Sequence, residues 1–504
     1  MVRVVTDYLD ITVRKYPDKI AFVDEKRSIT FSELQNEAHH IATRLIEEGF
    51  FKQPILVYLD KSVEVVAAFQ GITYSGNFYS PLDTHMPEER ILKIVEKLNP
   101  KGIITDKAHE EEAKKIIGDG ELIIYEEALV HPIHLDEIVA RTEQVIDSDV
   151  LYVLFTSGST GIPKGVIISH KGIVDLSEWI AKDLRFDENI IFANQSPFYF
   201  SFSVYEIYQT LRNGSTTYII PQRLFSQPTK LMTYLDENKV NTIIWVPSIL
   251  TLISTLKALN RPHLTHLKNV FFGAESFQVK HLNRWMNEYS KARFINLFGP
   301  TEVTDTCTWY EIERRFEDGE LLPIGKSCTN KDCFLLDDGK LVTEEGHLGE
   351  ICMRGSGVAY GYYNDPERTD EVFIQNPLNS AYKETIYCTG DLGKYNDRGE
   401  LIYVCRKDFQ IKHRGRRIEL GEIETAVVAL AEIVECCCLY DNKKLRIVLF
   451  YTGNIDGKEI NEKLKDTLPE YMLPGKRVQL DEMPHNLNGK IDRQKLKDLI
   501  DSEE

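Results

Sequence analysis

A chain of 504 residues is longer than one hydrophobic core usually serves, so the length predicts two or more domains. Hydrophobic residues make up 42% of the chain and charged residues 27%, which is the composition of an ordinary globular protein. The net charge of −18 argues against a nucleic acid or an anionic membrane as partner, because both attract basic surfaces.

Neither end of the chain nor its cysteines suggest export. The N-terminus lacks a basic segment followed by a long apolar core, and no charge-free run of 18 apolar residues could span a membrane. The nine cysteines show no paired zinc-type spacing, and Cys436, Cys437 and Cys438 lie in an apolar run where buried thiols are expected. We therefore expect a cytoplasmic protein with reduced thiols.

Apolar strand-like runs alternate with amphipathic helical stretches along most of the chain, as at residues 55–59, 102–105, 217–220 and 242–246. This alternation predicts a large α/β domain. The pattern changes near residues 385–405, where Asn396-Asp397-Arg398-Gly399 indicates a hairpin turn and a basic segment follows. We expect an N-terminal domain over residues 1–405 and a small α+β domain over residues 406–504.

A loop rich in hydroxyl groups and glycines follows the apolar run 150–155. Residues 156–166 contain four hydroxyl side chains, three glycines and one lysine. Glycines let backbone N–H groups turn toward an anion, and hydroxyls and an ammonium add donors, so the loop predicts binding of the phosphates of ATP. The common P-loop would have Ser or Thr after the lysine, where this chain has Gly165. A flexible surface linker is the alternative, but a linker rarely follows a buried strand directly.

The loop resembles the phosphate loop of the adenylate-forming superfamily, which includes acyl-CoA synthetases, luciferases and nonribosomal peptide adenylation domains. The resemblance runs from Tyr16-Pro17-Asp18-Lys19 to Asp492, and thus over the whole chain. It implies a large α/β domain with a small mobile lid. It also implies that the phosphates are held by Thr156, Ser157, Gly158, Ser159, Thr160 and Lys164.

Further superfamily strings imply the rest of the nucleotide site. In Asn296-Leu297-Phe298-Gly299-Pro300-Thr301-Glu302, Phe298 and Thr301 match positions beside the adenine, and Glu302 matches the glutamate that binds Mg2+. Phe298 stands where adenylation domains usually have tyrosine, a change that keeps stacking and loses a hydroxyl. Asp391, after the turn at Gly390, matches the carboxylate that accepts the ribose hydroxyls, although an isolated Gly-Asp would equally be a solvated turn.

The C-terminal strings match the lid. Arg406 looks like the arginine that helps to hold the nucleotide, Asp408 matches the hinge, and Gly415 matches the loop that faces the acceptor thiol. As bare sequence, this basic stretch could also be a solvated face. Lys490 matches the lysine that spans the substrate carboxylate and the α-phosphate, where it offsets their repulsion.

The string Phe200-Ser201-Phe202-Ser203-Val204-Tyr205-Glu206 resembles the segment that begins the acid pocket. In amino-acid-activating members an aspartate at the position of Ser201 binds the α-ammonium. Serine supplies no countercharge, so the sequence argues against ordinary α-amino acid activation. The other pocket positions implied by the resemblance are the gate residue Phe198, together with Phe202, Tyr205, Phe271, Gly273, Leu297, Asp305 and Thr306.

Among these positions, the aromatic residues and Leu297 narrow the pocket, and Gly273 is expected to open it locally. Asp305 is the unexpected member: a carboxylate on the pocket wall, some distance from Ser201. It could hold an ammonium displaced from the α-carbon, as in a β- or ω-amino acid, or accept a hydrogen bond from a phenolic hydroxyl. The alternative is an Asp305 that points to solvent or pairs with a helix end.

The sequence therefore predicts a ligase that uses ATP and Mg2+ to convert a small carboxylic acid, not an ordinary α-amino acid, into an acyl-adenylate. The acyl group would pass to a phosphopantetheine thiol. Because the chain ends at Glu504 without a carrier module, we expect a separate carrier protein in trans, docked on the basic cluster Lys412, Arg414, Arg416 and Arg417.

Four alternatives remain open. One is an acyl-CoA ligase that uses free CoA, and another is an enzyme that passes the adenylate to an amine. The third is a D-alanine:carrier protein ligase, which the chain resembles in length and in Pro197-Phe198-Tyr199-Phe200, although those ligases have Asp where Ser201 stands. The last is a non-catalytic nucleotide-binding protein, which is disfavoured because every catalytic position is matched.

Overall fold

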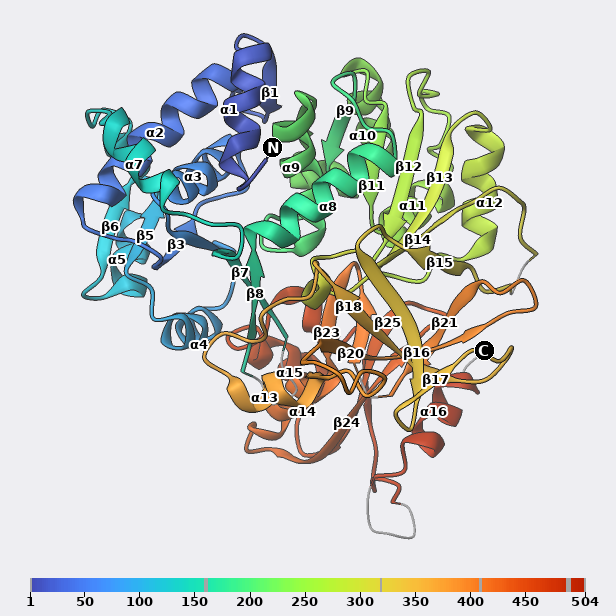
Figure 1. Ribbon diagram of the computed structural model, residues 1–504. Helices are drawn as coiled ribbons and strands as arrows, with labels where there is room; N and C mark the ends of the chain where they lie inside the picture. The colour runs from blue at the N-terminus through green and yellow to red at the C-terminus, as the bar shows by residue number, and fades with distance from the viewer. Residues whose placement is uncertain (1, 158–161, 318–319, 408–409, 486–490, 503–504) are drawn as a thin grey trace. The chain divides into compact units, whose positions relative to one another are not determined.

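The computed structural model describes residues 2–157, 162–317, 320–407, 410–485 and 491–502 (Figure 1). The chain forms two compact units. The large unit comprises Met1–Thr84, Leu98–Leu154 and Gly165–Cys405, and the small unit comprises His85–Lys97, Phe155–Lys164 and Arg406–Glu504. The large unit is α/β and the small unit combines helices with sheets, which confirms the expected fold class.

A six-stranded sheet in the order β6-β5-β3-β4-β7-β8 carries the phosphate loop between its last two strands. The strand β7 ends at Thr156, where the loop begins, and β8 begins at Lys164, where it ends. The helix α2 of this region begins with a capping box, in which Thr30 and Glu33 satisfy each other's backbone N–H groups. The elements are α1 (Thr6–Lys15), α2 (Phe31–Glu47), β3 (Pro54–Tyr58), α3 (Val63–Tyr74), β4 (Phe78–Leu82), β5 (Gly102–Thr105), α5 (Glu110–Ile117), β6 (Glu121–Ile124), α6 (Tyr125–Ala128), α7 (Leu135–Glu143), β7 (Val150–Thr156) and β8 (Lys164–Ser169).

A fifteen-stranded sheet contains the remaining strands of the large unit, in the order β17-β16-β18-β20-β21-β15-β14-β13-β12-β11-β9-β10-β1-β2, with β19 paired to β20. Strands β9 to β13 run parallel to their sheet neighbours in this group. The elements of this half are β1 (Ile20–Val23), β2 (Ser28–Thr30), α8 (His170–Asp183), β9 (Ile191–Asn194), η1 (Ser201–Ser203), α9 (Val204–Asn213), β10 (Thr216–Ile219), η2 (Gln222–Ser226), α10 (Pro228–Glu237), β11 (Thr242–Trp245), α11 (Pro247–Thr255), β12 (Asn269–Gly273), α12 (Val279–Glu288) and β13 (Arg293–Phe298).

Both faces of this parallel half are covered by helices, which is why β11 and β12 are buried at every position and mostly apolar. Phe272 and Trp245 pack in one cluster with α10, α11 and α12, whereas Phe271 and Ile244 pack in the other with α8 and α9. The face that packs with α8 and α9 carries the predicted acid pocket.

The antiparallel half of the same sheet follows β13. Its elements are η3 (Thr301–Val303), β14 (Thr308–Glu311), β15 (Pro323–Ser327), β16 (Lys331–Asp337), β17 (Lys340–Val342), β18 (Gly349–Gly355), α13 (Pro366–Val372), β19 (Phe373–Gln375), β20 (Thr385–Tyr395) and β21 (Leu401–Arg406).

The small unit contains two sheets. The hairpin β22-β23 forms one, and the other has the order β24-β25-β26. Arg90 and Glu422 form a buried ion pair between α4 and α14 inside this unit. The thiols of Cys436, Cys437 and Cys438 are buried, as expected. The elements are α4 (Glu88–Leu98), β22 (Gln410–His413), β23 (Arg416–Glu419), α14 (Leu420–Val428), β24 (Ile433–Asp441), β25 (Arg446–Gly453), α15 (Gly457–Leu464), η4 (Glu470–Met472), β26 (Lys476–Gln479) and α16 (Arg493–Asp501).

Within the described residues, none of the helices has both the length and the apolar character needed to cross a bilayer.

Candidate active site

The loop between β13 and β14 is strained and carries the candidate magnesium and acid-pocket residues. Thr304 and Asp305 are consecutive non-glycine residues with φ of 54° and 68°, a backbone conformation that costs of order 1–3 kcal/mol per residue. The loop folds back on the Gly-Pro turn, so that a Cβ at Gly299 would collide with the carbonyl oxygen of Asp305. Strain of this kind persists only where surrounding contacts enforce it.

Lys331, at the start of β16, supplies those contacts. Its ammonium is buried and donates to the carbonyl oxygens of Val303 at 3.1 Å, Thr304 at 3.4 Å and Thr306 at 2.6 Å. Lys331 was not among the residues predicted from the sequence. The only signal was a lysine that opens an apolar strand, and a solvated strand end explains that pattern equally well.

The loop places Asp305 in direct contact with Ser201. The Ser201 hydroxyl donates to Asp305 Oδ1 at 2.7 Å and lies 3.2 Å from Thr301 Oγ1. Thr306 Oγ1 donates to Asp305 Oδ2 at 3.4 Å, and the Tyr205 hydroxyl bonds to Thr306. The expectation that Asp305 lies some distance from Ser201 is therefore wrong, and the side chain does not point to solvent, since Asp305 is 5% exposed.

The environment of Asp305 favours its neutral form. Burial raises the pKa of Asp305 from 3.8 to about 6, and the hydrogen bonds from Ser201, Tyr205 and Thr306 and the charge of Lys331 offset only part of that effect. A desolvated carboxylate of this kind is stabilised when a cationic or hydrogen-bond-donating group contacts it.

Aromatic side chains surround this polar group. The rings of Phe202 and Tyr205 meet edge-on at 5.4 Å, and Phe271 packs against Phe186 at 5.2 Å. Leu297 lies beside Gly273 on the neighbouring strand. A Cβ at Gly273 would collide with the Leu297 carbonyl oxygen, so the close approach of β12 and β13 explains this glycine, and the structure does not support the idea that it serves to open the pocket.

Phe198, the predicted gate residue, is buried and contacts a lysine that the sequence analysis did not assign. Lys61 Nζ lies 5.6 Å from the centre of the Phe198 ring and donates to the carbonyl oxygens of Asn194 and Gln195 at 3.1 Å each. Desolvation lowers the pKa of Lys61 to about 7, and burial raises the pKa of Glu206 to about 8. Both groups titrate close to neutral pH beside the predicted pocket.

The predicted nucleotide residues of the large unit lie at the end of β13, in η3 and in the interior of β20. Phe298 ends β13 and packs against Tyr403, with ring centres 6.1 Å apart. Glu302 is fully buried, and the hydroxyl of Tyr362 donates to its Oε1 at 2.8 Å. A buried carboxylate beside hydroxyl groups suits a hard cation such as Mg2+.

Asp391 is buried in a bulge of β20. Glu350 pairs with Leu392 and Cys352 with Cys388, so Thr389, Gly390 and Asp391 face a single residue of β18. Gly390 has φ of 74° and donates its N–H to Glu350 Oε1 at 2.8 Å, and Asp391 N–H donates to Thr389 Oγ1 at 3.0 Å. Bulges of this type reorient a side chain next to a site.

The small unit contains residues 156, 157 and 162–164 of the predicted phosphate loop. Thr156 Oγ1 is buried and, among the described residues, lacks a hydrogen-bond partner. The Ser157 hydroxyl donates to the carbonyl oxygen of Arg417 at 2.7 Å, and Lys164 Nζ lies 3.3 Å from Glu419 Oε1. The β22-β23 hairpin therefore contacts both ends of the loop, and Glu419 neutralises its lysine.

Of the remaining predicted residues, the structure describes Arg406 and Gly415 but not the five that belong to the loop, the hinge and the C-terminal region. Arg406 ends β21 and begins the small unit. Gly415, with φ of 76°, forms the turn of the β22-β23 hairpin with Arg414, whose φ is 52°. Gly158, Ser159, Thr160, Asp408 and Lys490 lie outside the residues that the structure describes.

Comparison with known proteins identifies the family of this chain. Residues 9–363 match the family described as AMP-binding enzyme. The chain is 31% identical over 490 residues to tyrocidine synthase 1 of Brevibacillus parabrevis, a match that covers 95% of this chain and 44% of that protein. It is 30% identical over 511 residues to D-alanine--D-alanyl carrier protein ligase of Bacillus licheniformis, covering 97% of this chain and 99% of the ligase.

Among solved structures, holo-PA1221, described as an NRPS protein containing adenylation and PCP domains, has a TM-score of 0.82 and 22% identity, over 98% of this chain and 84% of that one. At this identity the likeness concerns the fold alone. Several curated relatives are much longer than this chain, which spans between 6% and 44% of the length of four of them. Since the family match covers residues 9–363 and the ligase match extends over nearly all of both chains, this chain belongs to the AMP-binding enzyme family.

Proposed function

We propose that this chain activates a small carboxylic acid with ATP and transfers the acyl group to a thiol. In the first step a carboxylate oxygen attacks the α-phosphorus, an acyl–phosphate bond forms, and pyrophosphate leaves. In the second step a phosphopantetheine thiol attacks the acyl carbon, loses its proton to solvent, and AMP leaves. Neither step changes an oxidation state, so the reaction needs no oxidant or reductant.

The chain's own residues supply binding and charge compensation in this proposal. Thr156, Ser157, Gly158, Ser159, Thr160 and Lys164 hold the phosphates. Phe298 and Thr301 lie beside the adenine, Asp391 accepts the ribose hydroxyls, and Arg406 helps to hold the nucleotide. Lys490 spans the carboxylate and the α-phosphate, where a positive charge offsets the repulsion between two anions. Glu302 would hold Mg2+, which neutralises phosphate charge when it is bound; the buried carboxylate beside the Tyr362 hydroxyl supports this assignment.

One observation carries the proposal for the acid: the buried, under-solvated carboxylate of Asp305 lies 2.7 Å from the Ser201 hydroxyl. The acid should therefore present an ammonium or hydroxyl group to Asp305. Each added methylene moves an amine by about 1.3 Å along an extended chain. A β- or ω-amino acid, or a hydroxy acid, carries such a donor at a distance from its reacting carboxyl group that the number of methylenes sets.

The same contact favours a second candidate, a small α-amino acid such as D-alanine. Because Ser201 and Asp305 touch, a countercharge is available close to the position where related enzymes place an aspartate. The relative named D-alanine--D-alanyl carrier protein ligase, which matches over 99% of its length, supports this candidate.

ATP–pyrophosphate exchange tests both candidates. The panel contains β-alanine, longer ω-amino acids, hydroxybenzoates, short fatty acids and both enantiomers of small α-amino acids. We expect exchange with an acid that carries a donor, and we expect Asp305→Asn to lower its kcat/KM by about tenfold or more, the loss of a charge-assisted hydrogen bond. Ser201→Ala is the matched variant. It keeps the Asp305 carboxylate, so its kcat/KM should fall less than that of Asp305→Asn. Exchange with short fatty acids alone, at equal rates in both variants, would exclude a role for Asp305 in substrate binding.

For the second step we propose that residues near Asp408 form a hinge between domain 1–405 and lid 406–504, that Gly415 faces the incoming thiol, and that a separate carrier protein delivers it. The β22-β23 hairpin carries the basic side chains Lys412, Arg414, Arg416 and Arg417. Carrier proteins are usually acidic, so this hairpin is the proposed docking surface for the carrier. Free CoA is the alternative thiol.

Charge reversal tests the carrier surface. The double variant Arg416→Glu/Arg417→Glu reverses two of these charges. Because Arg416 also lies over the ring of Tyr471 at 3.9 Å, the double variant is compared with Lys458→Glu, a charge reversal at an exposed position of the same unit. We expect a higher KM for the carrier in the double variant only, with pyrophosphate exchange retained. Equal turnover with free CoA in all three proteins would favour the CoA ligase.

A further inference from the structure

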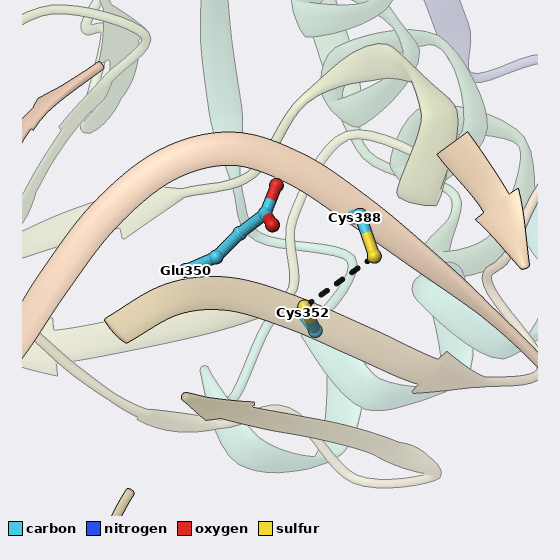
Figure 2. A group of neighbouring side chains, drawn as sticks. All are labelled: Glu350, Cys352 and Cys388. Carbon is cyan, nitrogen blue, oxygen red and sulfur yellow. Dashed lines mark hydrogen bonds between the residues drawn. The ribbon is translucent and has the colours of Figure 1, made fainter. Parts of the chain in front are cut away.

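Two cysteines that are 36 residues apart in the sequence face each other across β18 and β20. Cys352 pairs with Cys388 in the strand register, and their sulfur atoms lie 3.6 Å apart (Figure 2). Cys352 is buried and Cys388 is partly exposed. The spacing along the chain gave no sign of this pair, because only the pairing of the two strands creates it.

Glu350 completes the cluster. It precedes Cys352 by two residues on β18, so both side chains project from the same face of the strand. One ligand atom each from Glu350, Cys352 and Cys388 lies within 4.8 Å of the other two (Figure 2). Among the described residues, these three side chains form the one group of three possible metal ligands whose ligand atoms lie this close together.

The spacing of these atoms suits a tetrahedral thiophilic cation. With metal–sulfur bonds of about 2.3 Å, tetrahedral geometry places two thiolates about 3.8 Å apart, and a carboxylate oxygen about 3.6 Å from each sulfur. The observed sulfur–sulfur distance of 3.6 Å is close to that value. The Glu350 oxygen lies within 4.8 Å of both sulfur atoms, so a rotation of this side chain would bring it into range. Two thiolates and one carboxylate leave a fourth position for water.

The apolar surroundings also suit such a site. Cys352 and Cys388 pack among Phe334, Leu336 and Ile386. An apolar shell lowers the local dielectric constant and strengthens the attraction between thiolates and a divalent cation. The partial exposure of Glu350 and Cys388 gives the cation a route of entry.

We propose that Glu350, Cys352 and Cys388 bind a thiophilic divalent cation of the Zn2+ or Cd2+ type, and that its binding weakens nucleotide binding at Asp391. Binding of one cation replaces two S–H bonds with two metal–sulfur bonds and releases two protons to solvent. The cluster then carries one negative charge in total, from two thiolates, one carboxylate and one dication.

The β20 bulge couples the cluster to the nucleotide residue. Glu350 Oε1 accepts the N–H of Gly390 at 2.8 Å, and Asp391 is the next residue. A carboxylate that turns toward a cation weakens this hydrogen bond, which orients the bulge. This coupling rests on the proposed role of Asp391 in ribose binding, whereas cation binding itself does not.

Cadmium titration of the reduced, chelator-treated full chain tests cation binding. We expect one equivalent to give the sulfur-to-metal charge-transfer absorption, and Cys352→Ser or Cys388→Ser to weaken binding by about tenfold or more. Cys405→Ser removes an exposed thiol elsewhere and should leave the titration unchanged. On wild-type protein, zinc X-ray absorption should show two sulfur neighbours at about 2.3 Å, so the test does not depend on variants that fold. A coordination shell without sulfur, or cadmium binding that survives both serine substitutions, overturns the site.

AMP binding with and without one equivalent of Zn2+ tests the coupling. We expect the cation to raise the Kd for AMP at least severalfold in wild-type protein and to leave it unchanged in Cys388→Ser. Zn2+ binding with an unaltered Kd overturns the coupling. If the metal-free chain shows no AMP binding and no pyrophosphate exchange, the proposed function fails, and the cadmium and X-ray results still decide the cation site.

Discussion

Replacement of Asp305 by asparagine should stabilise the protein without ligand. Asparagine keeps the shape of the side chain and an oxygen that accepts the Ser201 hydrogen bond, but it carries no charge. The ionised carboxylate is buried, and its hydrogen bonds from Ser201, Tyr205 and Thr306 compensate only in part for the free energy of hydration that it loses. Removal of the charge therefore removes a cost of folding.

The pKa gives the size of the effect. A rise from 3.8 to about 6 is a shift of about two pKa units, which corresponds to about 3 kcal/mol. The folded protein binds the proton more tightly than the unfolded chain, so the free energy of unfolding of the wild type falls as the pH rises from about 4 to about 6. The advantage of the variant is thus absent below pH 4, about half developed at pH 5, and complete at pH 7 and above.

Thermal unfolding of both proteins at pH 8 and pH 5 measures this difference. For a unit of this size, about 3 kcal/mol corresponds to a Tm increase of a few degrees at pH 8. Asp370→Asn, an exposed aspartate on α13, is the control and should change Tm little at either pH. A variant that melts at or below the wild type at pH 8, or a gain of equal size at pH 5, would refute the claim that the carboxylate is desolvated.

Three further variants probe the contacts of the candidate site. Glu419→Gln removes the countercharge of Lys164, so the KM for ATP in pyrophosphate exchange should fall by roughly fivefold, about 1 kcal/mol; an unchanged KM would mean that this ion pair does not compete with ATP. Tyr362→Phe removes the hydroxyl bound to Glu302 and should raise the Mg2+ concentration needed for half-maximal exchange by about tenfold with little change in Tm, whereas a large loss of Tm would indicate a structural role. Lys331→Met leaves three carbonyl groups without their buried donor and should lower the free energy of unfolding by about 3 kcal/mol, as measured in urea; a neutral result would show that the strained loop is held by other contacts.

The architecture followed from local patterns in the sequence. Apolar runs such as residues 242–246 are continuous because both faces of their sheet are covered, and that burial makes them recognisable without any neighbour. The predicted phosphate loop was equally visible, since Thr156, Ser157 and Lys164 are close in sequence and flank the connection between β7 and β8. A signal contained in one short segment can be read before the fold is known.

The contacts between distant segments depended on the tertiary structure. Ser201 and Asp305 are 104 residues apart, and their hydrogen bond exists because a strained loop, held by Lys331, turns Asp305 inward. Cys352 and Cys388 meet only because β18 pairs with β20 in one register. Side-chain periodicity along a strand predicts which face a residue occupies, but it does not predict which residue of a remote strand lies opposite, since register is decided by packing over the whole sheet. The sequence by itself thus determined the family and the fold class of this protein, while tertiary packing decided that Ser201 contacts Asp305 and that Cys352 lies opposite Cys388.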